Sequence, residues 1–104
     1  MRGDEVLAAV EVADTRATRR RGLLGRDGVD GALALTPARA VHTLGMRFDL
    51  DVAYLDGGGR VLDLHRMRRG RVGLPRWRAR SVLEAEAGAF DTWGLRVGDV
   101  VTMR

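Results

Sequence analysis

The chain has 104 residues, of which 45% are hydrophobic and 31% are charged, and its formal net charge is +4. This length suits a single domain with one core, and the hydrophobic fraction is ordinary for a globular protein, which excludes a disordered chain. Every basic residue is arginine and cysteine is absent, which excludes thiol catalysis, disulfides and cysteine-based zinc sites.

The N-terminal segment gives the first indication of compartment. Two acids precede a short apolar run there, unlike the basic start of a secretion signal. No stretch approaches the roughly 18 apolar residues of a membrane span. We therefore expect a cytoplasmic protein.

The first elements are expected to be a strand followed by a short helix. Residues 5–13 are rich in valine and alanine and partly alternate, which predicts a strand. Asp14 and Thr15 offer side-chain oxygens that can cap a helix over residues 16–24. Gly25 is expected to end that helix.

The middle of the chain predicts short strands. Candidates are residues 32–35, 40–44 and 51–55. The triple glycine at 57–59 is a hairpin signal, and residues 60–65 are expected to return as the partner strand. His65 is predicted to lie on the polar face of that strand.

The last third begins with a basic loop over residues 66–80 and regains order in a strand at 81–86. A helix over residues 87–93 is expected to end at Gly94. A Gly98-Asp99 turn then leads into a final short strand.

Short strands separated by turns, together with one or two short helices, predict a mostly β (α+β) fold. We expect residues 1–104 to form one compact, small β-barrel-like domain. No repeat or interdomain linker interrupts it.

Four segments, in this order, resemble motifs of the family called domain of unknown function 192. They are RRRGLLGR at 19–26, VHTLGMRFDLDVAYLD at 41–56, SVLEAEAG at 81–88 and GLRVGD at 94–99. The chain departs from the family pattern at Leu24, Asp49 and Ala85. The resemblance implies a compact β-rich, barrel-like domain, and it implies no activity because the family has no agreed reaction, substrate or cofactor.

One group of polar residues offers a first candidate site. This polar cluster contains His42, Arg47, Asp49 and Asp51. Imidazole and carboxylates are able to form a metal site or an acid–base pair. The spacing fits no familiar ligand motif, and the structural interpretation is that a half-buried Asp51 pairs with Arg26 or Arg47.

A basic segment without acids offers the second candidate. This basic strip contains Arg66, Arg68, Arg69, Arg71, Arg76, Trp77, Arg78 and Arg80. If residues 76–80 are extended, three guanidinium groups project on one face and the Trp77 indole on the other. Such a composition is typical of surfaces that bind single-stranded nucleic acid. The competing interpretation is a solvated loop enriched in arginine by codon bias, with Trp77 folded back as a hydrophobic lid.

Catalytic groups are scarce. Ser81 is the single serine, and it has neither a nucleophile-elbow motif nor an adjacent histidine. Glu84 and Glu86 are expected to face solvent from one strand, not to meet across a cleft.

We therefore expect no catalytic residue, no metal and no cofactor. The leading hypothesis is a non-catalytic binding or accessory module for an acidic partner, either a protein segment or nucleic acid. The alternative is a small metal-dependent or hydrolytic enzyme that uses His42, Asp49 and Asp51.

Overall fold

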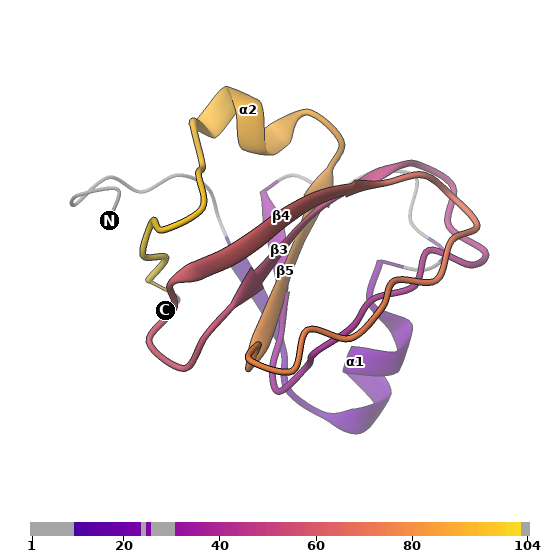
Figure 1. Cartoon of the computed structure of the whole chain (residues 1–104). Coiled ribbons are helices and arrows are strands. Elements are labelled where there is room, and N and C mark those ends of the chain that lie inside the picture. The colour runs from indigo at the N-terminus through magenta and orange to yellow at the C-terminus, as the bar shows by residue number, and fades with distance from the viewer. Residues whose placement is uncertain (1–9, 24, 26–30, 103–104) are drawn as a thin grey trace.

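The computed structural model describes residues 10–23, 25 and 31–102 (Figure 1). Its elements in chain order are β1 (Val10–Ala13), α1 (Arg16–Arg21), β2 (Ala32–Leu35), β3 (Leu50–Leu55), β4 (Val61–Met67), β5 (Ser81–Glu86) and α2 (Ala89–Trp93). The predicted mostly β class with two short helices is confirmed. Residues 5–9 of the expected first strand and residue 24 of the expected helix lie outside the described residues.

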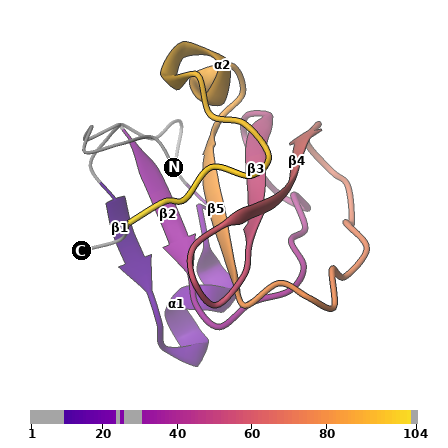
Figure 2. The same cartoon turned by 60° about the vertical axis from the view of Figure 1, so that its left-hand side comes forward.

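The five strands form one mixed sheet in the order β1-β2-β5-β3-β4. β1 and β2 run parallel, and the other neighbouring pairs are antiparallel. The sheet is twisted, and β1 and β4 are its two edges (Figure 2). Because these edge strands do not pair with each other, the sheet does not close into the expected barrel. β5 lies at the centre of the sheet. It is covered on both faces, because Val82 and Leu83 belong to the apolar clusters of opposite faces.

Each face of the sheet has its own apolar layer. On one face, Leu23, two residues after α1, joins a cluster that contains Leu35, Leu50, Val52 and Tyr54. On the other face, the buried members are Ala32, Ala34, Ala53, Leu55, Val61, Leu83, Ala85, Phe90 and Leu95. Because Phe90 belongs to α2, the two helices cover opposite faces.

The predicted cap of α1 is confirmed, but the helix is shorter than expected. The Thr15 hydroxyl accepts from the Thr18 amide at 3.1 Å, and the Thr18 hydroxyl accepts in return from the Thr15 amide at 3.1 Å. Gly22 ends the helix with φ +50 and donates to the Thr18 carbonyl at 3.0 Å. Glycine adopts a positive φ at no steric cost, so Gly22 is able to end the helix three residues before the expected Gly25.

The triple-glycine hairpin is also confirmed. The Asp56 carboxylate accepts from the backbone amides of Gly58 and Arg60, both at 2.9 Å. These bonds lower the pKa of Asp56. Gly59 has φ +83, and a Cβ there would lie 2.4 Å from the Val101 carbonyl oxygen. The turn and the close approach of the C-terminal segment both require glycine at this position.

The expected strand at 40–44 is wrong in detail, since its regular pairing reduces to one bridge between His42 and Val72. Residues 36–46 instead run beside residues 68–80 as an irregular antiparallel pair, which we call the ribbon (Figure 1). Backbone bonds join Ala38 to Arg80, Arg39 to Arg76, Val41 to Gly73, and Thr43 to both Gly70 and Arg71. The ribbon thus gives order to the loop expected at 66–80.

Candidate functional site

The polar cluster does not assemble around one point. Asp51 is paired across the sheet with Arg66 and Ala85, and its carboxylate lies under α2. His42 belongs to the ribbon, on the opposite face of the sheet. Asp49 precedes β3 and contacts Arg69. Among the described residues, no three histidine or acidic side chains lie close enough together to hold a metal ion.

Asp51 organises the start of α2. Its Oδ2 accepts from the amides of Gly88 at 2.9 Å and Phe90 at 3.1 Å, and its Oδ1 accepts from the Arg66 Nε at 3.0 Å. Gly88 at the N-cap position has no side chain of its own, so the Asp51 carboxylate supplies the cap from β3. The guanidinium that pairs with this buried acid is that of Arg66. The sequence suggested Arg26 or Arg47, and Arg26 lies outside the described residues.

Asp51 and its partner also border a pocket of about 290 Å³ beside α2. Asp91 lies at its rim, where its Oδ2 is 3.3 Å from the Arg66 Nη2. His65 lines the same pocket and is exposed, as the sequence predicted. The Asp51 hydrogen bond and charge raise the pKa of Arg66, so the guanidinium stays ionised and engaged.

Two further arginines of the basic strip are held by acids at its margins. The Arg69 amide donates to Asp49 at 2.9 Å. Arg76 is 3.1 Å from the Asp63 Oδ2 and lies over the Tyr54 ring, 4.5 Å from its centroid. Cation–π contact and ion pairing together fix the Arg76 side chain.

The other four arginines of the strip, Arg68, Arg71, Arg78 and Arg80, are exposed and form no salt bridge within the part of the chain that the structure describes. Arg78 lies close enough to Asp56 to help lower the pKa of that acid. Neither ribbon segment, 36–46 or 68–80, contains an aspartate or glutamate. The ribbon is therefore a positively charged surface.

Trp77 is not folded back as a lid, because it is 76% exposed. The Ala79 amide donates to the Arg76 carbonyl at 2.9 Å, which makes residues 76–79 a turn with Trp77 and Arg78 at its tip. Ala79 is fully buried and Arg76 is anchored as above, so both ends of the turn are fixed. Residues 76–80 consequently do not alternate as an extended strand would.

Exposed apolar side chains accompany Trp77 along the ribbon. Leu74 is 76% exposed, Val72 is 70% exposed and Leu44 is 49% exposed. Single exposed apolar groups are common, but here four of them belong to a ribbon that carries no acidic residue, and this composition favours a binding surface.

The structure also shows a buried acid that sequence reasoning placed in solvent. Glu84 is 4% exposed, whereas Glu86, two residues further along β5, is exposed as expected. Burial raises the pKa of Glu84 to about 7. The available signal was the run Val82-Leu83-Glu84-Ala85, whose lack of alternation indicates a central strand covered on both faces.

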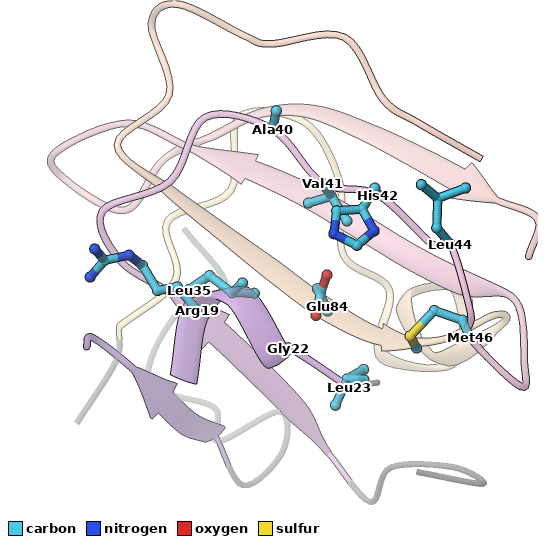
Figure 3. A pocket seen from close by; sticks show the side chains of 10 residues that line it. All are labelled: Arg19, Gly22, Leu23, Leu35, Ala40, Val41, His42, Leu44, Met46 and Glu84. Carbon is cyan, nitrogen blue, oxygen red and sulfur yellow. The ribbon is translucent and has the colours of Figure 1, made fainter. Parts of the chain in front are cut away.

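Glu84 lies in a pocket of about 60 Å³ between α1, β2, β5 and the 40–46 part of the ribbon, which we call the Glu84 pocket (Figure 3). Its apolar walls come from Leu23, Leu35, Val41, Leu44 and Met46. In the part of the chain that the structure describes, the Glu84 Oε1 has no hydrogen-bond partner.

Comparisons with known proteins agree with this fold. Residues 1–103 match the family model DUF192, described as "Uncharacterized ACR". A UPF0127 protein of Thermococcus gammatolerans is 35% identical over 99 residues, which cover 89% of this chain and 65% of that protein. The chain thus spans slightly less than two thirds of the length of this relative.

A crystal structure of a protein of unknown function from Novosphingobium aromaticivorans superposes with a TM-score of 0.80 at 21% identity, covering 90% of this chain and 74% of the other. At that identity the likeness concerns the fold alone. No helix in the described residues is long and apolar enough to cross a membrane.

Proposed function

The chain belongs to the DUF192 family of uncharacterised proteins, and we propose that it is a non-catalytic binding module whose ribbon binds an acidic partner, single-stranded nucleic acid. The proposal rests on the chain's own surface, because the family and the relative described above are uncharacterised.

The observation that carries the proposal is the turn at 76–79. An exposed indole costs free energy in water unless a partner covers it, and here the turn holds it outward between two anchored residues. A base that stacks on such an indole gains about 1–3 kcal/mol without regard to sequence. Trp77 at the tip thus offers a stacking platform.

The arginines that are not engaged by acids supply the electrostatic part. Arg78 lies beside Trp77 in the turn, and Arg80 immediately precedes β5. Arg68 and Arg71 extend the positive surface toward the other end of the ribbon. Guanidinium groups bind phosphates bidentately, and four such contacts give a salt dependence of binding with a slope of roughly −3 on a double-logarithmic plot.

The aromatic residue distinguishes nucleic acid from an acidic protein segment. Carboxylates of an acidic peptide satisfy the same arginines, but a peptide rich in aspartate and glutamate has no flat ring to place on Trp77. A strand of nucleic acid brings a phosphate and a base in every repeat, so it uses the guanidinium groups and the indole together.

The test is fluorescence anisotropy of a labelled single-stranded oligonucleotide titrated with the protein at several salt concentrations. We expect saturable binding that weakens with salt, and weaker binding with a shallower salt slope for Arg78→Gln. Arg96→Gln is the matched control, because Arg96 is equally exposed but follows α2, away from the ribbon.

Two results would overturn the proposal. One is no binding at low salt. The other is equal weakening by Arg78→Gln and Arg96→Gln, which means that net charge alone attracts the oligonucleotide. Polyglutamate is added as a competitor: if it binds as tightly as the oligonucleotide and Trp77→Ala changes neither affinity, the partner is an acidic protein segment.

A further inference from the structure

The Glu84 pocket is separate from the surface of the basic strip. It lies under the other ribbon segment, with His42 and Met46 on one wall and Leu23, two residues after α1, on another (Figure 3). Its volume of about 60 Å³ is enough for two or so water molecules or a small head group, and too small for a drug-sized ligand.

Glu84 forms the polar end of this pocket. It stands on the central strand, opposite Leu33 of β2 and Val52 of β3, so apolar neighbours flank it on both sides. Gly22 brings α1 so close that a Cβ there would lie 3.2 Å from the Glu84 Oε1. A carboxyl in such surroundings loses its hydration and needs a donor in exchange.

The described residues provide no cation for this carboxyl. Arg19 lines the pocket, but its Nη1 donates to the carbonyls of Asp14 at 2.6 Å and Thr36 at 3.4 Å. Figure 3 shows its guanidinium directed away from Glu84. His42 lies across the pocket and is exposed. The buried Tyr54 hydroxyl, on the neighbouring strand β3, also has no hydrogen-bond partner within the described ranges.

We propose that the Glu84 pocket binds the primary ammonium group of a ligand that has an unbranched alkyl stem. The ammonium donates to the Glu84 carboxylate and restores the hydrogen bonds and the counter-charge that burial removed. The stem lies against the side chains of Leu44 and Met46 and leaves past His42. A single carboxylate among apolar walls suits an organic cation better than a metal ion, which needs several oxygen ligands.

The proposal predicts a defined pH dependence. An alkylammonium ion is charged throughout the neutral range, so binding follows the ionised fraction of Glu84, whose pKa is about 7. The apparent affinity at about pH 5.5 is then about thirtyfold lower than at about pH 8.5. In the described residues, the other titratable groups that line the pocket or lie beside Glu84 are Arg19 from α1, His42 from the ribbon and Tyr54 from β3.

The experiment is an NMR titration of the protein with n-butylammonium at constant ionic strength, followed through the Leu23 and Met46 methyl groups. The neutral isostere n-butanol tests for a purely apolar pocket, and n-butyltrimethylammonium tests the need for an N–H donor. Glu84→Gln keeps the size of the side chain and removes its charge. Glu86→Gln, the same change at an exposed position of the same strand, is the matched control.

We expect n-butylammonium to bind the wild-type protein and Glu86→Gln alike, and at least about tenfold more weakly to Glu84→Gln. Three results would each overturn the proposal. They are equal binding of n-butanol, equal binding of n-butylammonium by Glu84→Gln, and no change in the methyl chemical shifts with n-butylammonium at the higher pH. If Glu84→Gln fails to fold, the pKa of Glu84 in the wild-type protein is measured instead, from the pH dependence of its carboxyl carbon resonance. A pKa lowered by n-butylammonium supports the site, and an unchanged pKa refutes it.

Discussion

Replacing Glu84 by glutamine should make the stability of the protein less dependent on pH. The pKa of Glu84 is raised from 4.5 to about 7 by burial, so the folded state binds this proton more tightly than the unfolded state does. Its effect on stability is therefore most favourable below pH 4.5 and is lost as the pH rises through about 7. Glutamine has no such titration.

The magnitude follows from the two pKa values. Between pH 5 and pH 8, ionisation of Glu84 lowers the free energy of unfolding of the wild-type protein by about 2–3 kcal/mol relative to Glu84→Gln. For a domain of this size, that corresponds to a difference of roughly 10 to 20 °C in Tm. Because the pH dependence is compared, any fixed cost of burying the glutamine amide cancels.

The assay is urea denaturation, or thermal denaturation, of both proteins across this pH range, with Glu86→Gln as the control for a charge change at an exposed position. If the wild-type and Glu84→Gln curves run parallel with pH, Glu84 ionises as easily in the folded state as in the unfolded state, and the burial argument is refuted.

Three other substitutions test separate parts of the fold and of the ribbon. Asp51→Asn should lower the free energy of unfolding, measured by urea denaturation, by about 2–4 kcal/mol, because it weakens the α2 cap and removes the charge that pairs with Arg66. Asp49→Asn, at a more exposed carboxylate, should lower it by less than about 1 kcal/mol. Gly73→Ala places a Cβ 2.8 Å from the Val41 carbonyl oxygen of the facing ribbon segment, so it should lower the free energy of unfolding by about 1–3 kcal/mol. In the control Gly57→Ala the new Cβ meets no atom nearer than 3.8 Å and should be nearly neutral, and equal effects of the two changes would contradict the described packing of the ribbon. Trp77→Ala should change Tm little, since the side chain is 76% exposed, but it should weaken oligonucleotide binding by about 1–3 kcal/mol in the anisotropy assay. Unchanged binding would contradict base stacking on Trp77.

Local chemistry made part of the fold predictable. The hydroxyl of Thr15 and the glycines at 57–59 act on their own neighbours in the chain, so the start of α1 and the β3–β4 hairpin could be placed from sequence. Strands β2 and β5 coincide with the predicted residues, because apolar runs bounded by turn residues leave little choice of limits.

The sequence did not predict which residues from distant segments contact one another. Asp51 was correctly expected to need a guanidinium, but the choice of Arg66 depends on the register of β3 with β4. Glu84 seemed solvent-facing because nothing local shows that β5 lies between β2 and β3. Trp77 could be interpreted as a lid or as a platform until the turn at 76–79 fixed its direction.

The measurement that tests the proposed function most directly is the fluorescence of Trp77 on adding a single-stranded oligonucleotide. Trp93 packs against Phe90, with ring centroids 5.7 Å apart, and Trp93→Phe leaves Trp77 as the single reporter. A base stacked on the indole quenches its emission, so we predict saturable quenching that salt reverses. Binding by anisotropy without any change in Trp77 emission would contradict the stacking platform, and an absence of both would contradict the nucleic-acid proposal as a whole.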